Sequence, residues 1–209
     1  MNELSLNTLI KEYGFFSNDF LNKIIHSFLI KKGFKENATL KELYDFSKIN
    51  FVIKTSNITQ NKIEYINHLS HPDIPIKQII QMTTCVPFVF KPIKFNNDFY
   101  LDGGVCGNFP IEYIRKLKIK NYFAINIRNK FVHKEINSIF DYLSTISRLP
   151  FSSTDIIKNN KKIITIECET DGISDILQNK IDKNHKMKLI TYGYNEISKH
   201  FKKYYKQVD

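Results

Sequence analysis

The chain has 209 residues, of which 42% are hydrophobic and 25% are charged. That is enough chain and enough apolar side chain to bury a core, so the composition excludes an intrinsically disordered protein. The formal net charge of +10 comes from 31 Lys and Arg against 21 Asp and Glu, and nearly all of the cations are lysines. Since guanine and bidentate phosphate contacts favour arginine, we expect a solvated lysine-rich surface, which also suits contact with an anionic membrane, and no specific nucleic-acid site.

The sequence shows neither a targeting signal nor paired cysteines, and both observations bear on where the protein is located. No apolar run approaches the roughly 18 residues of a membrane-spanning helix, and the first residues lack the basic-then-apolar layout of a signal peptide. The three cysteines are widely spaced and contain no Cys-x-x-Cys pair, which argues against a disulfide framework or a zinc site. We therefore predict a cytoplasmic protein, with peripheral contact at membranes as an extension of this prediction.

The chain begins with helical patterns. Apolar residues at i, i+3, i+4 and i+7 predict a helix over residues 6–13 that ends at Gly14. Ser17 or Asn18 is expected to cap a second helix, which ends at Gly33 after two lysines near the C-terminal dipole. The apolar stripe of this helix consists of Phe20, Leu21, Ile24, Ile25, Phe28 and Leu29.

A helix, two strands and a further helix follow. Thr39 and Glu42 have the spacing of a capping box, which opens a short third helix. The β-branched residues of the segment 50–56 predict a buried strand, and a weaker strand over 62–66 is expected to pair with it. Isoleucines at helical spacing predict a helix over 76–84 that ends before the Val-Pro step.

The C-terminal half continues the alternation of helices and strands. Helices are predicted over 110–117, over a stripe at 136–146, and over 187–204, where sustained three-four spacing favours packing on a sheet. Strands are predicted over 122–127 and 163–166. This alternation predicts the α/β class, with a mainly parallel sheet flanked by helices and no obvious linker.

The segment 100–110, Tyr-Leu-Asp-Gly-Gly-Val-Cys-Gly-Asn-Phe-Pro, stands out. It holds three of the chain's seven glycines, namely Gly103, Gly104 and Gly107. Asp102 lies where a predicted strand ends and a tight turn begins, which is where open α/β sheets bind ligands. Pro110 is expected at the first position of the next helix, with Asn108 as its cap. An Asp-Gly pair is also a common turn former, so taken alone this pattern predicts a turn-forming aspartate.

Residues 83–93, Thr-Thr-Cys-Val-Pro-Phe-Val-Phe-Lys-Pro-Ile, lie upstream of this segment. Together the two pieces resemble the C-terminal half of the patatin-like phospholipase domain, and the similarity extends over about residues 6–127. In that family the aspartate of the Asp-Gly-Gly motif is the general base of a Ser–Asp catalytic dyad. The resemblance maps that aspartate onto Asp102 and implies hydrolysis of a phospholipid or other acyl lipid without a cofactor.

A Ser–Asp hydrolase also needs a serine on a sharp turn, usually Gly-x-Ser-x-Gly, and a glycine-rich loop for the oxyanion. The sequence has neither before Asp102, where only Gly14 and Gly33 occur, each at a predicted helix end. The resemblance therefore implies a single partial patatin-like domain over residues 1–209 that lacks the N-terminal strands and the nucleophile elbow. A truncated gene, a split gene and a misassigned start all remain open.

Two other patterns are weaker candidates for a functional site. Cys106 is the best alternative nucleophile, but its surroundings lack the spacing of an elbow and contain no nearby histidine. His68, His71 and Asp73 have a spacing that metal ligands use, yet they lie in a proline-containing segment without a further ligand nearby, and a connecting loop is the simpler interpretation.

Three function hypotheses follow from the sequence. The first is a patatin-like lipid acyl hydrolase to which this chain contributes Asp102, with the serine supplied by other sequence or by a second chain. The second is a catalytically inactive remnant or partner subunit that binds a lipid surface or another protein, because a sheet without its first strands exposes an apolar edge. The third, a basic nucleic-acid-binding protein, is supported by net charge alone and ranks last.

Overall fold

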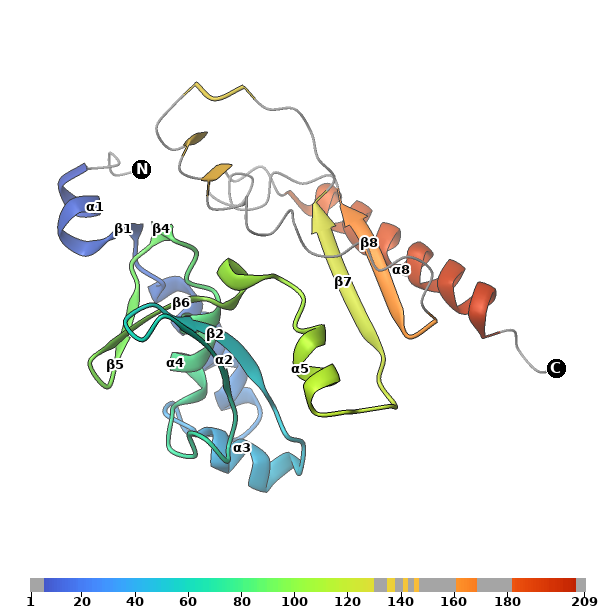
Figure 1. Cartoon of the computed structure of the whole chain (residues 1–209), viewed down its shortest axis with the longest axis horizontal. Helices are drawn as coiled ribbons and strands as arrows, with labels where there is room; N and C mark the ends of the chain where they lie inside the picture. Colours follow the sequence, from blue (N-terminus) through green and yellow to red (C-terminus); the bar gives the residue numbers. More distant parts are fainter. Residues whose placement is uncertain are drawn as a thin grey trace. The chain divides into compact units, whose positions relative to one another are not determined.

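The computed structural model describes residues 6–129, 135–137, 141–142, 145–146, 161–168 and 182–205 (Figure 1). The chain divides into two compact units. The first comprises Met1–Asn108 with Ser138–Thr154, and the second comprises Phe109–Asn137 with Asp155–Asp209. Asp102 belongs to the first unit. The expectation of one domain over the whole chain stays a prediction.

Between residues 6 and 108 the first unit carries four helices and six strands. In chain order these are α1 (Leu6–Glu12), β1 (Gly14–Phe16), α2 (Asp19–Lys31), α3 (Leu40–Ser47), β2 (Ile53–Asn57), β3 (Lys62–Ile66), α4 (Ile76–Thr83), β4 (Phe88–Phe90), β5 (Ile93–Phe95) and β6 (Asp98–Asp102). A short 3₁₀ turn, η1 (Gly103–Cys106), follows β6 directly. Most of these elements lie within a few residues of their predicted positions.

The strands of the first unit form two sheets. Four strands in the order β3-β2-β6-β5 make an antiparallel sheet, and β1 pairs with β4 in parallel. The expected pairing of the segment 62–66 with its neighbour is confirmed by β2 and β3. The α/β class is confirmed, but this larger sheet is antiparallel because β2–β3 and β5–β6 are hairpins with short turns, which force antiparallel pairing.

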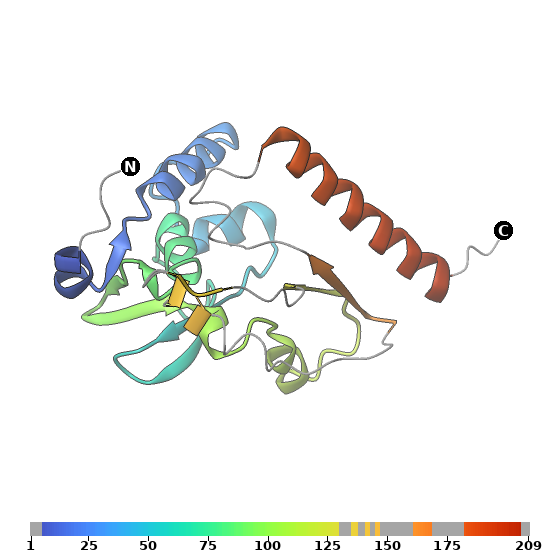
Figure 2. The same cartoon turned by 90° about the horizontal axis from the view of Figure 1, so that it is seen from above.

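Helices α2, α3 and α4 gather on one side of these strands, as Figure 2 shows from above. Helix α4 contacts β2 and β6, and α2 contacts α4. The buried cluster between them consists of Ile25, Leu29, Ala38, Leu40, Ile53, Ile66, Ile74, Ile76, Ile79, Met82 and Tyr100. Of the stripe predicted on α2, Ile25 and Leu29 are buried, whereas Phe20, Ile24 and Phe28 remain exposed.

Helix ends agree only partly with the sequence patterns. The capping box is present: Thr39 Oγ1 accepts the N–H of Glu42, and Glu42 accepts the N–H of Thr39. Asn18 precedes α2, but its side chain donates to the carbonyl of Gln81 and makes no cap. Asn18 Oδ1, the atom that would accept a capping bond, has no hydrogen-bond partner among the described residues.

The second unit is smaller in its described part. Helix α5 (Ile111–Lys116) comes first, β7 (Ala124–Asn129) and β8 (Ile163–Cys168) pair in parallel, and α8 (Lys183–Tyr204) contacts β8 (Figure 1). The predicted cap at Asn108 is wrong, because Pro110 has a non-helical ψ of 35° and itself precedes the first helical residue without a side-chain cap. The stripe predicted at 136–146 lies largely outside the described residues.

The capping box allows a direct test of local stability. Thr39→Ala removes the hydroxyl that accepts the Glu42 N–H and so breaks one of the two bonds of the capping box. We expect the free energy of unfolding, measured in urea, to fall by about 1 kcal/mol. Thr39→Ser keeps the hydroxyl and should retain most of that stability. Equal unfolding midpoints for the alanine and serine variants would contradict the role of the hydroxyl.

Candidate functional site

Asp102 ends β6 and begins the turn η1, at the place where the sequence predicts it. Its main chain is held from two sides. The Asp102 N–H donates to the carbonyl of Cys85 at 2.9 Å, and its carbonyl accepts the hydroxyl of Ser56 at 3.0 Å. In the β2–β6 ladder Asp102 stands opposite Thr55. The backbone that carries the carboxylate is therefore fixed to the end of α4 on one side and to β2 on the other.

The carboxylate of Asp102 is half-buried and serves as the cap of η1. Its Oδ1 accepts the N–H of Gly104 at 2.6 Å. Burial raises the pKa of Asp102 above its ordinary value, and the Gly104 N–H and the Lys54 ammonium oppose this by lowering it. Within the described residues no group bonds the second oxygen, Oδ2. Asp102 is thus the turn-forming residue that the bare Asp-Gly pair predicts, and it also keeps one carboxylate oxygen available to accept a proton.

The glycine after Asp102 is required by packing. A Cβ at Gly103 would lie 2.6 Å from the carbonyl carbon of Lys54 and closer still to its oxygen, a distance that backbone atoms do not tolerate. Gly107, which closes the turn, has φ of +100°, where side chains are strained. Gly103 therefore allows the turn to approach β2 and Gly107 allows the chain to leave it.

Lys54 is a residue of this site that sequence analysis does not identify. It lies on β2, and its ammonium donates to the main-chain carbonyls of Cys106, at 2.9 Å, and Gly107. These carbonyls lie at the end of η1, 52 and 53 residues away in the sequence. No motif contains Lys54, since in sequence it is one lysine among many, so only the pairing of β2 with β6 reveals it.

Two hydroxyl residues of β2 flank Asp102 and neither has the setting of a nucleophile. Ser56 is buried within a strand and its hydroxyl donates to the Asp102 carbonyl. Thr55 is fully buried, and its hydroxyl has no hydrogen-bond partner within the described part of the chain. A nucleophilic serine needs an exposed turn that projects its hydroxyl, so Ser56 is structural.

The cysteines divide by exposure. Cys106 is exposed at the end of η1, and its carbonyl accepts a bond from Lys54. Cys85 is fully buried, its thiol contacts the Lys91 carbonyl, and burial, with the charge of Asp102, raises its pKa to about 12. Cys168 is partly buried. Cys85 is therefore a buried core side chain and too weak an acid to act as a thiolate.

The histidines of the loop after β3 make ordinary polar contacts. His68 stacks on Tyr44 with ring centroids 3.7 Å apart and contacts Asn50 through Nδ1, while His71 contacts the hydroxyl of Ser70. Among the described residues no group of three or more His, Cys, Asp or Glu side chains is placed to hold a metal ion. The contacts of His68 and His71 fit the connecting-loop interpretation.

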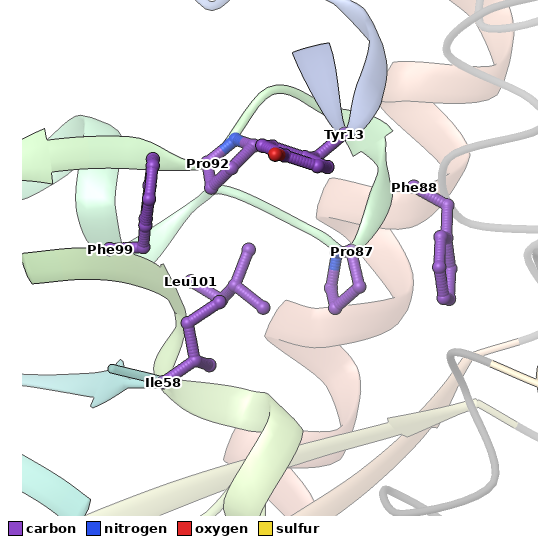
Figure 3. Close-up of a pocket in the computed structure, with 7 residues that line it drawn as sticks. All are labelled: Tyr13, Ile58, Pro87, Phe88, Pro92, Phe99 and Leu101. Atoms are coloured by element: carbon purple, nitrogen blue, oxygen red, sulfur yellow. The ribbon is translucent and has the colours of Figure 1, made fainter. Parts of the chain in front are cut away.

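An apolar pocket of about 330 Å³ adjoins the same strand (Figure 3). It is lined by Tyr13, Ile58, Pro87, Phe88, Pro92, Phe99 and Leu101. In Figure 3 the side chains of Ile58 and Leu101 lie next to each other at the lower side, and those of Tyr13 and Pro92 lie together at the upper side. Leu101 precedes Asp102, and since neighbouring side chains on a strand face opposite ways, the pocket and the carboxylate occupy opposite faces of β6.

Tyr13 and Phe88, two residues of this pocket, have positive φ of 62° and 65°. Such values are uncommon for residues other than glycine and cost free energy that the surrounding structure must supply. Gly14 beside Tyr13 has no room for a side chain, because a Cβ there would overlap the backbone of Phe90. The close parallel pairing of β1 with β4 therefore fixes both residues at the pocket wall.

Comparison with known proteins agrees with this arrangement. The sequence model of the family described as patatin-like phospholipase matches residues 2–115, which is more than half of the chain and includes Asp102. The chain belongs to the patatin-like phospholipase family. The resemblance noted on the Asp-Gly-Gly segment is thereby confirmed at the level of the family.

Two viral proteins are similar to this patatin-like chain. A probable lipid hydrolase of Invertebrate iridescent virus 6 is 33% identical over 101 residues, which cover 48% of this chain and 35% of that protein. An uncharacterized protein of Acanthamoeba polyphaga mimivirus is 24% identical over 223 residues, covering 94% of this chain and 72% of that protein. The chain thus matches about a third of the length of the iridescent virus protein, and the family to which it belongs is one of phospholipases.

No helix within the described residues is long and apolar enough to cross a membrane.

The raised pKa of Asp102 predicts how its substitution changes stability with pH. A carboxyl whose pKa is higher in the folded state stabilises the fold below its ordinary value of 3.8, and that contribution is lost as pH rises through the folded value. An asparagine at this position would keep an acceptor for the Gly104 N–H without a charge. We therefore expect Asp102→Asn to gain stability relative to the parent as pH rises above the ordinary value of 3.8, measured by urea unfolding.

Asp98→Asn is the matched control on the same strand. Hydrogen bonds from Asn57 and Gln60 lower the pKa of Asp98, so its ionised form stabilises the fold above the ordinary carboxyl pKa. The stability of this variant relative to the parent should fall as pH rises toward the ordinary value of 3.8 and stay level above it, which is the opposite sign and a lower pH range than for Asp102→Asn. A difference between Asp102→Asn and the parent that is constant with pH would contradict the burial of Asp102.

Proposed function

We propose that this chain carries the aspartate half of a lipid acyl hydrolase, which cleaves carboxylic esters of phospholipids or other acyl lipids through a Ser–Asp dyad. The observation that carries the proposal is the position of Asp102 within the region matched by the family. Its carboxylate is held by its own turn and has one oxygen available, which suits a general base.

The reaction assigned to this dyad proceeds in two halves. The serine hydroxyl attacks the ester carbonyl while its proton passes to Oδ2 of Asp102, and main-chain N–H groups stabilise the oxyanion. Asp102 then returns the proton to the departing alcohol, which leaves an acyl-serine. Water, deprotonated by the same carboxylate, hydrolyses the acyl-serine to the free fatty acid and restores the serine.

The serine is assigned to residues outside these 209. No Gly-x-Ser-x-Gly occurs in the sequence, and Ser56, whose hydroxyl contacts the main chain of Asp102, is buried in a strand. We infer that a second chain, or chain beyond these residues, supplies the elbow and completes the single partial domain over residues 1–209.

The pocket beside β6 is assigned to the remote end of an acyl chain. Its volume of about 330 Å³ lies at the small end of ligand pockets, and its lining is apolar. Because it lies on the face of β6 opposite to the Asp102 carboxylate, it suits the hydrocarbon tail rather than the ester. The net charge of +10 would assist approach to an anionic lipid surface from the cytoplasm.

A second candidate function is a non-catalytic partner subunit that binds lipid surface or protein. The missing elbow favours it, as do the exposed apolar side chains on or near β2 and β3, namely Ile58 and Ile63. Neither candidate involves a cofactor or a metal ion, and the +10 charge alone does not support nucleic-acid recognition.

Activity tests distinguish the two functions. The serine-bearing segment can be sought by reading the flanking and neighbouring genes for Gly-x-Ser-x-Gly. In its complex with this chain, Asp102→Asn should reduce fatty-acid release from phospholipid vesicles by at least about 10³-fold. Loss of the base leaves the serine unactivated, and effects of this size are typical of general bases. A folded Asp102→Asn complex that retains activity would overturn the dyad.

A fluorophosphonate probe checks the location of the nucleophile. The purified 209-residue chain should remain unlabelled, and the complex should be labelled on the added segment. Labelling of the chain alone would show that one of its own serines is the nucleophile, contrary to the proposal.

The acyl assignment of the pocket can be tested without catalysis. A fluorescent long-chain fatty acid should bind the purified chain, and Ile58→Gln, which places an amide in the pocket wall, should weaken binding about tenfold. Leu69→Gln is the control, since Leu69 is 78% exposed and does not line the pocket. Equal binding of the fatty acid by both variants would contradict the assignment of the pocket to an acyl chain.

A further inference from the structure

Lys54 joins three parts of the first unit at one point. Its ammonium donates to the main-chain carbonyls of Cys106 and Gly107, which are the last acceptors of the turn after Asp102. Its own carbonyl accepts the hydroxyl of Thr83 at 2.9 Å, at the end of α4. The lysine therefore connects α4, the strand β2 and the far end of the turn η1.

The ends of this turn are held by different means. At its start, Oδ1 of Asp102 accepts the Gly104 N–H, and Gly103 lies against the Lys54 backbone. At its end, the Gly107 N–H donates to the Gly104 carbonyl at 2.9 Å. Terminal carbonyls of a helical turn lack partners within the turn and carry partial negative charge, so a cation is the best donor for them.

The position of the ammonium also bears on the charge of Asp102. Lys54, from β2, is the cation that favours ionised Asp102, and Cys85, whose carbonyl accepts the Asp102 N–H, is the titratable thiol that the charge of Asp102 affects. Burial works against ionisation. Lys54 is thus placed to affect both the conformation of the turn and the charge state of the carboxylate.

We propose that Lys54 is a positioning residue for Asp102, which acts by tying the carbonyl end of the turn Gly103–Gly107 to β2. It does not touch the substrate in this scheme. The proposal rests on the role of Asp102 as the general base, and it adds that this base depends on a lysine outside the Asp-Gly-Gly motif.

Amide hydrogen exchange and carboxyl titration on the 209-residue chain test the proposal without any serine or substrate. In Lys54→Met, exchange of the Gly104 and Gly107 amides should accelerate by about tenfold or more, because the turn loses its anchor. The Asp102 carboxyl, followed by carbon NMR, should titrate at higher pH than in the parent, because the cation that favours its ionised form is gone.

Two further variants show whether the effect depends on a cation at position 54 and whether it is specific to that lysine. Lys54→Arg keeps a cation with several donors and should restore most of the protection and the titration. Lys94→Met is the control: it removes a lysine of β5 that stands over the Phe99 ring, and it should change neither readout.

Each outcome decides the matter. Parent-like exchange in Lys54→Met would overturn the proposal, and so would faster exchange without a shift of the Asp102 titration, since that result describes a purely structural lysine. If Lys54→Met does not fold, Lys54→Gln keeps an N–H donor without the charge, and the titration shift is expected with partial protection. Failure of the proposed function would appear separately. In that case the Asp102→Asn complex would stay active, while Lys54→Met would still show the faster exchange and the shifted Asp102 titration.

Discussion

The pairing of β2 with β6 is the constraint on which the candidate site depends. It brings Thr55 opposite Asp102 and allows the backbone of Gly103 to lie against the carbonyl of Lys54, where no side chain fits. Once that approach is made, the turn can only run along β2, and the ammonium of Lys54 meets its last carbonyls. The carboxylate of Asp102 is therefore placed by backbone geometry, with side-chain bonds adding to it.

The same arrangement sets a balance at Asp102. Burial disfavours its ionised form, while one N–H donor and one nearby cation favour it. A carboxylate that is only partly compensated is a stronger base than one that is fully satisfied, because the proton it accepts relieves part of the desolvation. A structural cap would be more stable with both oxygens paired, so the single hydrogen bond from Gly104 suits the general base proposed for this position.

The sequence predicted local elements well and tertiary relations poorly. Helical spacing, the Thr39 box and the hairpin of β2 and β3 depend on neighbours in sequence, and the structure confirms them. The strand end at Asp102 was predicted for the same reason. Lys54 was not, because its relevance arises from carbonyls 52 and 53 residues away. Asn18 likewise makes no cap on α2, and its side chain instead donates to the carbonyl of Gln81 in α4.

The antiparallel sheet explains how an Asp-Gly-Gly segment can be formed independently of a nucleophile. The hydrogen bonds that hold Asp102 come from β2, from its own turn and from Cys85 at the end of α4, all within residues 54–107. Asp102 is thus fixed by a short continuous part of the chain that contributes much of its own core. In the proposed hydrolase, a serine delivered by other sequence would meet a carboxylate that is already oriented, so little conformational entropy would need to be lost on assembly of the site.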